Sequence, residues 1–308
     1  MRMDICYALT SRGDDLYSQQ TFVSASLVRW IHPEARITLV VDELTEPALH
    51  SCRDRVLDIA CDVVRIATGM ENPTSRSRVL KTTMRGHVEG DLLYLDSDTL
   101  PIGRFDELFE HGAPLAAVQD YTEQLLGLRR PRWVRDLYRH LQWQYPPKHY
   151  FNGGVLFMAD RPETHRFAEE WNRRWRRCVA EANCMLDQPS LNSAVDEVGL
   201  KVKAMPHAFN CAVRSTVYPV RRARIFHYFT SQADKGCFSL LDHLVRHVRE
   251  RGDLDWQAVE RAAATGDPYV ADPPGFKCKV TSGRYRQAVL LCLARMVGLA
   301  RGTNVRCG

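Results

Sequence analysis

Two aspartates, spaced two residues apart, directly follow a short apolar segment. The segment Leu92 to Leu95 is apolar at every position and leads into Asp96 and Asp98. In an extended chain, positions i and i+2 face the same side. Carboxylate oxygens are hard ligands that suit Mg²⁺ or Mn²⁺ shared with a diphosphate. We therefore expect Asp96 and Asp98 to ligate a divalent cation, with an acidic surface turn as the alternative.

The same pair allows a second chemistry. Phosphatases of the haloacid dehalogenase class also place Asp-x-Asp after a hydrophobic strand, and their first aspartate is a nucleophile. Their motif carries one more residue before its threonine, whereas Thr99 follows Asp98 directly in this chain. The pair also lies deep in the chain instead of near its start. Metal binding is therefore the favoured interpretation, and the phosphatase is kept as an alternative.

The elements that must position these carboxylates predict an α/β fold. Strand patterns over 4–10, 37–41 and 62–66 alternate with helical patterns over about 18–31 and 45–56. Such alternation is typical of a mainly parallel sheet with crossover helices. The fully apolar segment 92–95 is expected at the centre of that sheet. Because open α/β sheets bind ligands beyond the carboxyl ends of their strands, Asp96 and Asp98 should stand at a crevice.

Further strands complete the predicted sheet. Strand patterns occur at 115–119, 150–158, 200–204 and 223–228, and helical patterns at 76–88, 162–183 and 188–197. Asn152-Gly153-Gly154 interrupts the start of one strand, which favours either a bulge or the close approach of a ligand. The sheet is expected to end near 230, and the last clear segment is an apolar helix over 284–301.

Composition and charge narrow the function classes. The 308 residues carry a net charge of +5, and the arginines cluster at 129–139, 173–177 and 221–224 instead of along one stripe. This distribution argues against a nucleic-acid partner. No signal peptide is visible, and the longest apolar run near the C-terminus is far shorter than the ~20 residues that span a bilayer. The 10 cysteines form no Cys-x-x-Cys pair. We therefore expect reduced thiols and a cytoplasmic protein.

A series of short motifs over residues 1–230 resembles the retaining glycosyltransferases of family 8, which include glycogenin and bacterial lipooligosaccharide galactosyltransferases. The first motifs match the donor site of that family. The resemblance implies that one group of residues holds the uracil and ribose of a UDP-sugar: Leu9, Thr10, Ser11 and Tyr17. It also implies that Arg78 and Lys81, on one helix face, meet the diphosphate or sugar. Asp120 would contact the donor sugar.

The later motifs match the metal and sugar sites of the family. Asp96, Ser97 and Asp98 resemble its metal-binding motif, with Ser97 among the donor contacts, and His227 in Ile225-Phe226-His227-Tyr228 resembles its third metal ligand. The resemblance implies a sugar pocket at Asn152 and Gly153. It places Asp187 and Gln188, in Asp187-Gln188-Pro189-Ser190-Leu191-Asn192, near the anomeric carbon, and Pro206 and Asn210 match a short element that follows.

Each of these matches has an alternative without a function. His227 could simply pack at the end of an apolar strand. Asn152-Gly153-Gly154 could be a simple bulge, and Asp187 could cap the helix that follows it. Lys81 could be a solvated helix residue. Because the motifs occur in the family's order, we favour the functional interpretation.

The chain departs from the family pattern after His227. The usual Lys-Pro-Trp is missing, and Tyr228-Phe229-Thr230-Ser231-Gln232-Ala233-Asp234-Lys235 stands there instead. The diphosphate contact of this element therefore falls either to Lys235 or to Arg78 and Lys81.

The resemblance implies a GT-A nucleotide-diphospho-sugar transferase fold, which is Rossmann-like with a mainly parallel mixed sheet. We expect residues 1–232 to form the catalytic domain and 233–308 a C-terminal helical extension. The implied activity is a retaining transfer of a hexose, glucose or galactose, from a UDP-sugar to a hydroxyl acceptor with Mn²⁺ or Mg²⁺ as cofactor. A sugar-phosphate nucleotidyltransferase and a non-catalytic nucleotide-sugar-binding protein are the further alternatives.

Two segments bear on partners. The segment between Asp120 and Tyr150 is rich in arginine and aromatics, including Trp133 and Trp143. This composition suits an anionic glycan or glycolipid acceptor, and an ordinary basic helix on the outside of the domain is an equal alternative. The tail over 284–301 mixes apolar residues with arginines, which favours peripheral contact with a membrane. Packing of this tail on the domain or on a second subunit, in a homo-oligomer, is the alternative.

Overall fold

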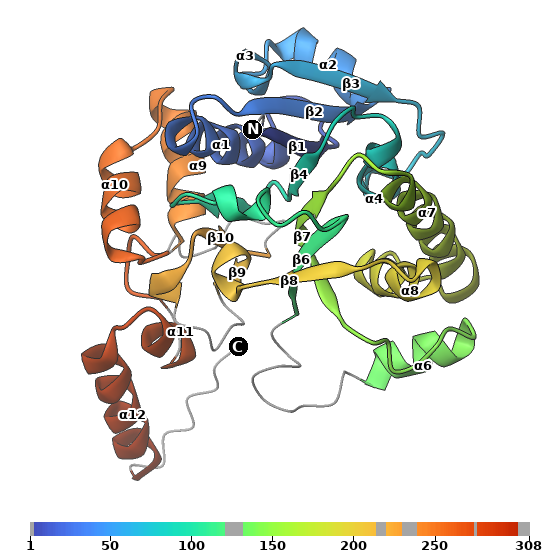
Figure 1. The fold of residues 1–308 in the computed structure, drawn as a ribbon. Coiled ribbons are helices and arrows are strands. Elements are labelled where there is room, and N and C mark those ends of the chain that lie inside the picture. Colours follow the sequence, from blue (N-terminus) through green and yellow to red (C-terminus); the bar gives the residue numbers. More distant parts are fainter. Residues whose placement is uncertain (1–2, 121–131, 214–219, 230–238, 274–275, 301–308) are drawn as a thin grey trace.

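A seven-stranded mixed sheet forms the body of the protein (Figure 1). The computed structural model describes residues 3–120, 132–213, 220–229, 239–273 and 276–300. Along the sheet the strands lie in the order β3 (Asp62–Ile66), β2 (Arg36–Asp42), β1 (Asp4–Leu9), β4 (Leu92–Leu95), β7 (Phe151–Met158), β6 (Leu115–Gln119) and β8 (Val202–Met205). Strand β7 is antiparallel to both of its neighbours, and the other pairs are parallel. The predicted mainly parallel α/β sheet is confirmed.

Helices cover both faces of this sheet (Figure 1). One face packs on α1 (Leu16–Ile31), α2 (Thr45–Cys52) and α3 (Val56–Ile59), in a core that contains Ile5, Ile37 and Leu93. The other face packs on α4 (Pro73–Thr83), α7 (Pro162–Ala182) and α8 (Gln188–Val198), around Cys6 and Trp171. Because β4 and β7 are buried on both faces, every residue of each strand is buried.

Helix caps set where two of the helices near the carboxyl ends of the strands begin. The carboxylate of Asp15 accepts hydrogen bonds from the backbone N–H groups of Tyr17 and Ser18, so α1 begins at Leu16, slightly earlier than expected. Asn72 caps α4 in the same way, and Pro73 occupies the first turn, where its missing N–H costs nothing. Further along α4, Arg78 and Lys81 line the crevice.

The segment expected as one helix near 45–56 is divided in two. Helix α2 ends at Cys52, and Arg53 adopts the left-handed conformation with a φ of 51°. The carboxylate of Asp54 then accepts from the N–H of Val56, where α3 begins. The sequence pattern missed this break because the local hydrogen bonds of an aspartate compete with the helix ladder.

A second, three-stranded sheet stands beside the first and was not predicted as a sheet. Its strands lie in the order β5 (Thr99–Pro101), β10 (Ile225–His227) and β9 (Cys211–Ala212). Strand β10 runs antiparallel to β5, and this pairing places His227 opposite Thr99. The short 3₁₀ turns η1 (Met84–Gly86), η2 (Asp106–Leu108), η3 (His207–Phe209) and η4 (Val220–Arg222) connect the longer elements.

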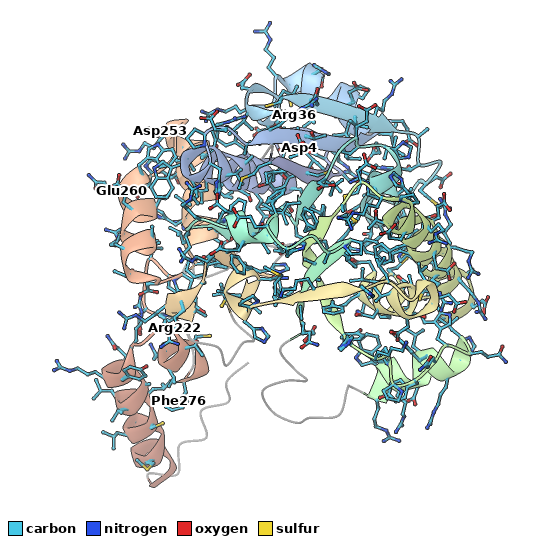
Figure 2. All side chains as sticks on the ribbon, viewed as in Figure 1. Asp4, Arg36, Arg222, Asp253, Glu260 and Phe276 are labelled. Atoms are coloured by element: carbon cyan, nitrogen blue, oxygen red, sulfur yellow. The ribbon has the colours of Figure 1, made fainter. Side chains whose placement is uncertain are left out.

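Helices make up most of the described C-terminal part of the chain. It contains α9 (Leu240–Arg251), α10 (Trp256–Thr265), α11 (Phe276–Thr281) and α12 (Tyr285–Ala300). One more helix, α6 (Arg132–His140), lies between β6 and β7 in the chain. Leu240, Leu244 and Val259 share an apolar core with Val23 and Leu27 of α1. Figure 2 shows charged side chains such as Asp253 and Glu260 at the outer edge of this part. The predicted domain boundary at 232 lies outside the described residues.

Across the described ranges, we find no helix with both the length and the hydropathy that crossing a bilayer requires.

Candidate active site at the carboxyl ends of the strands

A cavity of about 610 Å³ opens where β1, β4 and β6 end and β7 begins. This is the crevice at which open α/β sheets bind ligands. Its walls contain most of the residues that the sequence singled out: Leu9, Thr10, Tyr17, Arg78, Lys81, Asp96, Ser97, Asp98, Asp120, Asn152, Gly153, Asp187, Gln188 and His227. Local motifs spread over more than 200 positions are thus brought into one cavity.

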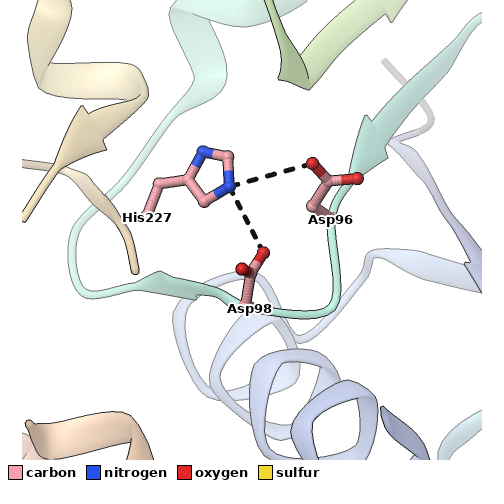
Figure 3. A group of neighbouring side chains, drawn as sticks. All are labelled: Asp96, Asp98 and His227. Carbon is pink, nitrogen blue, oxygen red and sulfur yellow. Dashed lines mark ion pairs between the residues drawn. The ribbon is translucent and has the colours of Figure 1, made fainter. Parts of the chain in front are cut away.

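Asp96, Asp98 and His227 form a compact group at one side of this cavity (Figure 3). The Nε2 atom of His227 lies 3.2 Å from Asp98 Oδ1 and 3.8 Å from Asp96 Oδ2. The two aspartates lie on the turn between β4 and β5, and the pairing of β10 with β5 places His227 beside them. The turn is fixed because the N–H of Asp96 donates to the carbonyl of Gly154, and the N–H of Tyr228 donates to the carbonyl of Asp98.

These three side chains fit a divalent cation. One ligand atom from each lies within 4.8 Å of the others, and they are the one group of three or more such ligands found in the part of the chain that the structure describes. Two carboxylates and one imidazole suit Mg²⁺ or Mn²⁺. The space beside them depends on Gly154, because a Cβ built there would lie 2.2 Å from His227 Cε1 and 3.0 Å from Asp96 Oδ2.

A charge cluster formed by the buried Lys81 and Asp187 and the partly exposed Arg78 lies next to the metal ligands. Lys81 Nζ lies 2.9 Å from Asp96 Oδ1 and 3.0 Å from Asp187 Oδ2. Arg78 Nε lies 3.3 Å from Asp187 Oδ1. Lys81 is only 4% exposed, so the solvated alternative for this residue is wrong. Asp187 precedes α8 at its cap position, yet its side chain makes no capping hydrogen bond, so the capping alternative is wrong as well.

Opposing effects set the charge states in this cluster. Burial raises the pKa of Asp187, but the cations of Lys81 and Arg78 lower it by more, and the net shift is downward. Burial lowers the pKa of Lys81, but Asp187 and Asp96 outweigh that effect and raise it. Asp187 and Lys81 are therefore both charged near neutral pH, and a buried carboxylate with a fixed negative charge faces the cavity.

The carboxamide of Gln188 is held from both sides. Its Nε2 donates to Asp120 Oδ2 at 2.7 Å, and its Oε1 accepts from Asn152 Nδ2 at 3.4 Å. Asp120 itself is fixed at the end of β6, because its N–H donates to the carbonyl of Tyr150. The pairing of β6 with β7 shifts register between Ala117 and Gln119, opposite the strand that contains Gly153 and Gly154. The pairing of β6 with β7 is therefore irregular beside these glycines, and the side chains of His227 and Asp96 also lie close to Gly154.

One predicted donor contact of the described residues, Ser11, does not line the cavity. Ser11 is buried behind it, where its Oγ accepts from the N–H of Gly13 and its N–H donates to Thr45 Oγ1. Lys235 lies outside the described residues. By contrast, Thr10 lines the cavity, and its Oγ1 is buried with no hydrogen-bond partner within the described protein. A bound polar ligand is the ordinary partner for such an atom.

The aromatic residues of the segment between Asp120 and Tyr150 divide into two groups. Trp133 lies at the start of α6, lines the cavity and is 47% exposed. Trp143 is buried against Tyr138 in a small apolar cluster below α6, and the guanidinium of Arg174 lies over its ring. The expectation that both tryptophans offer a surface to an acceptor is wrong for Trp143, because α7 covers it. Residues 121–131, with Arg129 and Arg130, lie outside the described residues.

Sequence reasoning missed several residues at this site. The Tyr94 hydroxyl donates to Asp96 Oδ1, although its strand was recognised only as apolar. Phe229 stacks on the His227 ring with centroids 3.9 Å apart, and its φ of 52° is unusual for a residue with a side chain. Leu186 also lines the cavity. Its place beside Asp187 was the signal that could have found it.

Comparison with solved structures places the architecture among known folds. The chain superposes on the galactosyltransferase LgtC, solved with donor and acceptor sugar analogues, with a TM-score of 0.52 and 16% identity over 88% of this chain and 98% of LgtC. It also matches an active-site mutant of LgtC with a TM-score of 0.50 and 17% identity, over 90% of this chain and 100% of that one. The fold is that of the GT-A glycosyltransferases.

The glycosyltransferase GlyE of Streptococcus pneumoniae TIGR4 is similar over 89% of this chain and 66% of its own, with 15% identity and a TM-score of 0.51. No protein-family model matches the sequence, and neither does any curated protein. At identities this low, the likeness establishes the fold, and the chemistry has to be argued from the site.

Proposed function

We propose that this chain is a metal-dependent glycosyltransferase of the family 8 type. In this proposal it transfers a hexose, glucose or galactose, from a UDP-sugar to a hydroxyl of a glycan or glycolipid with retention of configuration. One observation carries the proposal. A three-ligand metal group and the ionised, buried carboxylate of Asp187 with the clamped amide of Gln188 line the same cavity. The similar LgtC structure, with its donor and acceptor sugar analogues, supports the same reading.

Asp96, Asp98 and His227 would hold Mn²⁺ or Mg²⁺. When bound, the cation would supply Lewis-acid neutralisation of the charge that develops on the departing diphosphate. Lys81 adds a positive charge at the same end of the cavity, and its ammonium group contacts Asp96 and keeps that carboxylate oriented. In the proposal, this preformed arrangement lets UDP leave without a reorganisation of charges.

Asp187 and Gln188 would act on the sugar. A sugar that loses its leaving group acquires positive, oxocarbenium character, which a nearby negative charge or amide oxygen stabilises. Lys81 and Arg78 keep Asp187 ionised for this role. Gln188 presents its carboxamide at one fixed orientation because Asp120 and Asn152 hold both of its ends. A solved LgtC variant replaces an active-site glutamine by glutamate, which supports a role for Gln188.

The nucleotide would lie along the end of β1. Leu9, Thr10 and the half-exposed ring of Tyr17 line this part of the cavity and offer backbone, hydroxyl and aromatic contacts to uracil and ribose. We propose that Arg78 and Lys81 replace the missing basic element after His227. Both already balance Asp187, so they would serve the diphosphate and the sugar together.

Acceptor and membrane contacts extend the proposal beyond the donor site. Trp133 is placed to stack on an acceptor sugar at the mouth of the cavity. Helix α12 exposes Val289, Leu290, Leu293 and Met296, and we propose that this apolar face lies in a membrane interface. A cytoplasmic location, homo-oligomer formation and a catalytic domain over 1–232 are further parts of the same proposal.

Calorimetric titration of UDP, with and without Mn²⁺, tests the donor site. We expect binding that depends on Mn²⁺ in the wild type and is lost in Asp98→Ala. Asp253→Ala, a matched removal of an exposed carboxylate, should bind as the wild type does. No UDP binding in any condition would refute the proposal.

A product assay then separates the alternatives. A glycosyltransferase hydrolyses a UDP-hexose slowly to UDP and free sugar. A sugar-phosphate nucleotidyltransferase instead forms the nucleotide sugar from UTP and a sugar 1-phosphate and releases pyrophosphate. A phosphatase hydrolyses a phosphate ester and releases inorganic phosphate. UDP binding without any turnover would point to a non-catalytic binding protein.

A further inference from the structure

A chain of side-chain amides links the metal group to Gln188. His227 Nδ1 lies 2.7 Å from Asn210 Oδ1, and Asn210 Nδ2 lies 2.8 Å from Asn152 Oδ1. Asn152 Nδ2 in turn donates to Gln188 Oε1 at 3.4 Å, and Gln188 Nε2 donates to Asp120 Oδ2 at 2.7 Å. His227, Asn210 and Asn152 are buried, so these groups are shielded from competition by water.

The direction of this amide chain is fixed by the backbone. The N–H of Gly154 can only donate, and it donates to Asn152 Oδ1 at 2.8 Å. The oxygen of the Asn152 amide must therefore face Gly154, where it also accepts from Asn210. Since Asn210 presents its nitrogen to Asn152, its oxygen must face His227. A hydrogen-bond network assigned in this way determines a histidine tautomer.

This direction decides which nitrogen of His227 carries the proton. The amide oxygen of Asn210 is an acceptor, so Nδ1 must be the N–H donor, and Nε2 keeps its lone pair. Nε2 is the atom that faces Asp96 and Asp98. Without the Asn210 acceptor the opposite tautomer would be available, because Asp98 Oδ1 lies 3.2 Å from Nε2 and would accept a hydrogen bond from a proton placed there. Such a ring could not ligate a cation.

The far end of the amide chain agrees with the same direction. The Asp120 carboxylate accepts the N–H of Gln188, which leaves Gln188 Oε1 toward Asn152. The metal ligand and the proposed catalytic amide are thus oriented by one set of hydrogen bonds, with a backbone donor inside it and a carboxylate at its end.

We propose that Asn210 and Asn152 are positioning residues that hold His227 in the Nδ1–H tautomer, so that its Nε2 lone pair is available to the divalent cation. This inference rests on the proposed function for the identity of the ligand, and on the hydrogen bonds above for the tautomer. The partners of metal-bound histidines commonly change metal affinity about 10- to 100-fold when they are removed.

Two substitutions of Asn210 separate positioning from simple packing. Asn210→Asp is isosteric and loses the donor to Asn152 Oδ1, but its carboxylate still accepts from Nδ1, so His227 should stay in the Nδ1–H tautomer. Asn210→Leu removes the acceptor, so the proton should move to Nε2 and donate to Asp98. The readouts are a two-bond ¹H–¹⁵N spectrum of metal-free, histidine-labelled protein at mildly alkaline pH and the Mn²⁺ affinity measured by electron paramagnetic resonance with UDP present. The signal of His227 is assigned by its loss in His227→Gln.

We expect Asn210→Leu to bind Mn²⁺ about 10- to 100-fold more weakly than the wild type and Asn210→Asp to stay within a few-fold. Asn172→Leu is the matched control, since Asn172 donates to Thr82 on another helix and has no link to His227 in the described structure. Should Asn210→Leu fail to fold, Asn152→Asp supplies the second case. It keeps the acceptor for Gly154 and Asn210, and so should keep the tautomer.

The outcomes distinguish this inference from the proposed function. A wild-type His227 with a proton on Nε2 would overturn the inference, as would equal tautomer and Mn²⁺ affinity in the wild type and Asn210→Leu. A wild type with the Nδ1–H tautomer but no Mn²⁺ binding would instead refute the metal-dependent function, while the positioning of His227 would stand.

Discussion

The Nζ atom of Lys81 lies 3.0 Å from Asp187 Oδ2, and both residues are buried. Removing one partner of such a pair leaves an uncompensated charge away from water. We expect Lys81→Met to lower the free energy of unfolding by about 3 kcal/mol, near the lower end of the range for buried pairs, because Arg78 still contacts Asp187. Urea unfolding at neutral pH measures this loss.

A double-mutant cycle tests whether the loss comes from the pair. Asp187→Asn in the Lys81→Met background removes the unpaired charge, so the double variant should be more stable than the sum of the two single effects predicts. Strictly additive effects would contradict the interaction.

The same pair predicts a dependence of stability on pH. Folding holds the pKa of Asp187 below its ordinary value of 3.8, so the ionised carboxylate is favoured in the folded state. The stability that this shift contributes is fully present above pH 3.8 and is lost as the pH falls toward the folded-state pKa. The gap in unfolding free energy between the wild type and Lys81→Met should therefore shrink in acid. A gap that widens below that pH would contradict the assignment.

Gly154 should be essential for metal binding, whereas its neighbour should not. A Cβ at Gly154 would lie 2.2 Å from His227 Cε1, so the ring must move in Gly154→Ala. A Cβ at Gly153 would lie 3.3 Å from Asp187 Oδ2 and would crowd the charge cluster without contact to His227. We expect Gly154→Ala to weaken Mn²⁺ binding about 10- to 100-fold. Gly153→Ala should leave Mn²⁺ affinity nearly unchanged and slow turnover, and equal Mn²⁺ affinities in both variants would count against the site.

Local patterns predicted the part of this site that follows from single strands. Asp96 and Asp98 follow a strand whose four apolar residues predict a buried position. Because ligands bind beyond the carboxyl ends of the strands in open α/β sheets, the two aspartates were expected at the cavity, where they lie. The position of His227 beside these aspartates could not be predicted from a single strand, because it depends on the pairing of β5 with β10, each three residues long. The strand pattern over 223–228 indicated β10, but β5 has almost no pattern of its own, and nothing along the chain shows that these two segments pair across more than 100 positions.

Burial of polar residues was the other feature beyond reach of the sequence. Lys81 and Arg76 lie on helix α4, which has low overall hydropathy, yet both are buried. Their charges are compensated by ion pairs with residues of other elements, Lys81 with Asp96 and Arg76 with Asp42. The link between Asn210 and Asn152 likewise joins residues 58 positions apart. Hydrogen bonds between distant elements leave no periodic signal along the chain.

The two tryptophans near α6 should respond differently to truncation. Trp133→Ala removes an exposed ring at the mouth of the cavity, so stability should change by less than about 0.5 kcal/mol while transfer to an acceptor falls and donor hydrolysis is spared. Trp143→Ala leaves a cavity beside Tyr138 and should cost about 3–5 kcal/mol. Chemical unfolding and paired hydrolysis and transfer assays check both. Equal loss of hydrolysis and transfer in Trp133→Ala would exclude Trp133 from the acceptor site.

The exposed face of α12 should control attachment to anionic lipid. Val289, Leu290 and Leu293 are exposed along one side of the helix, beside the exposed Arg286. Apolar side chains at an interface gain about 0.8 kcal/mol per buried CH₂, and nearby basic residues add attraction to anionic headgroups. We expect the triple serine variant of these three residues to sediment less with liposomes that contain phosphatidylserine, and added salt to weaken binding of the wild type. Leu44→Ser, which removes an equally exposed leucine from another part of the surface, should bind as the wild type does. Unchanged sedimentation of the triple variant would contradict a role of this face in membrane contact.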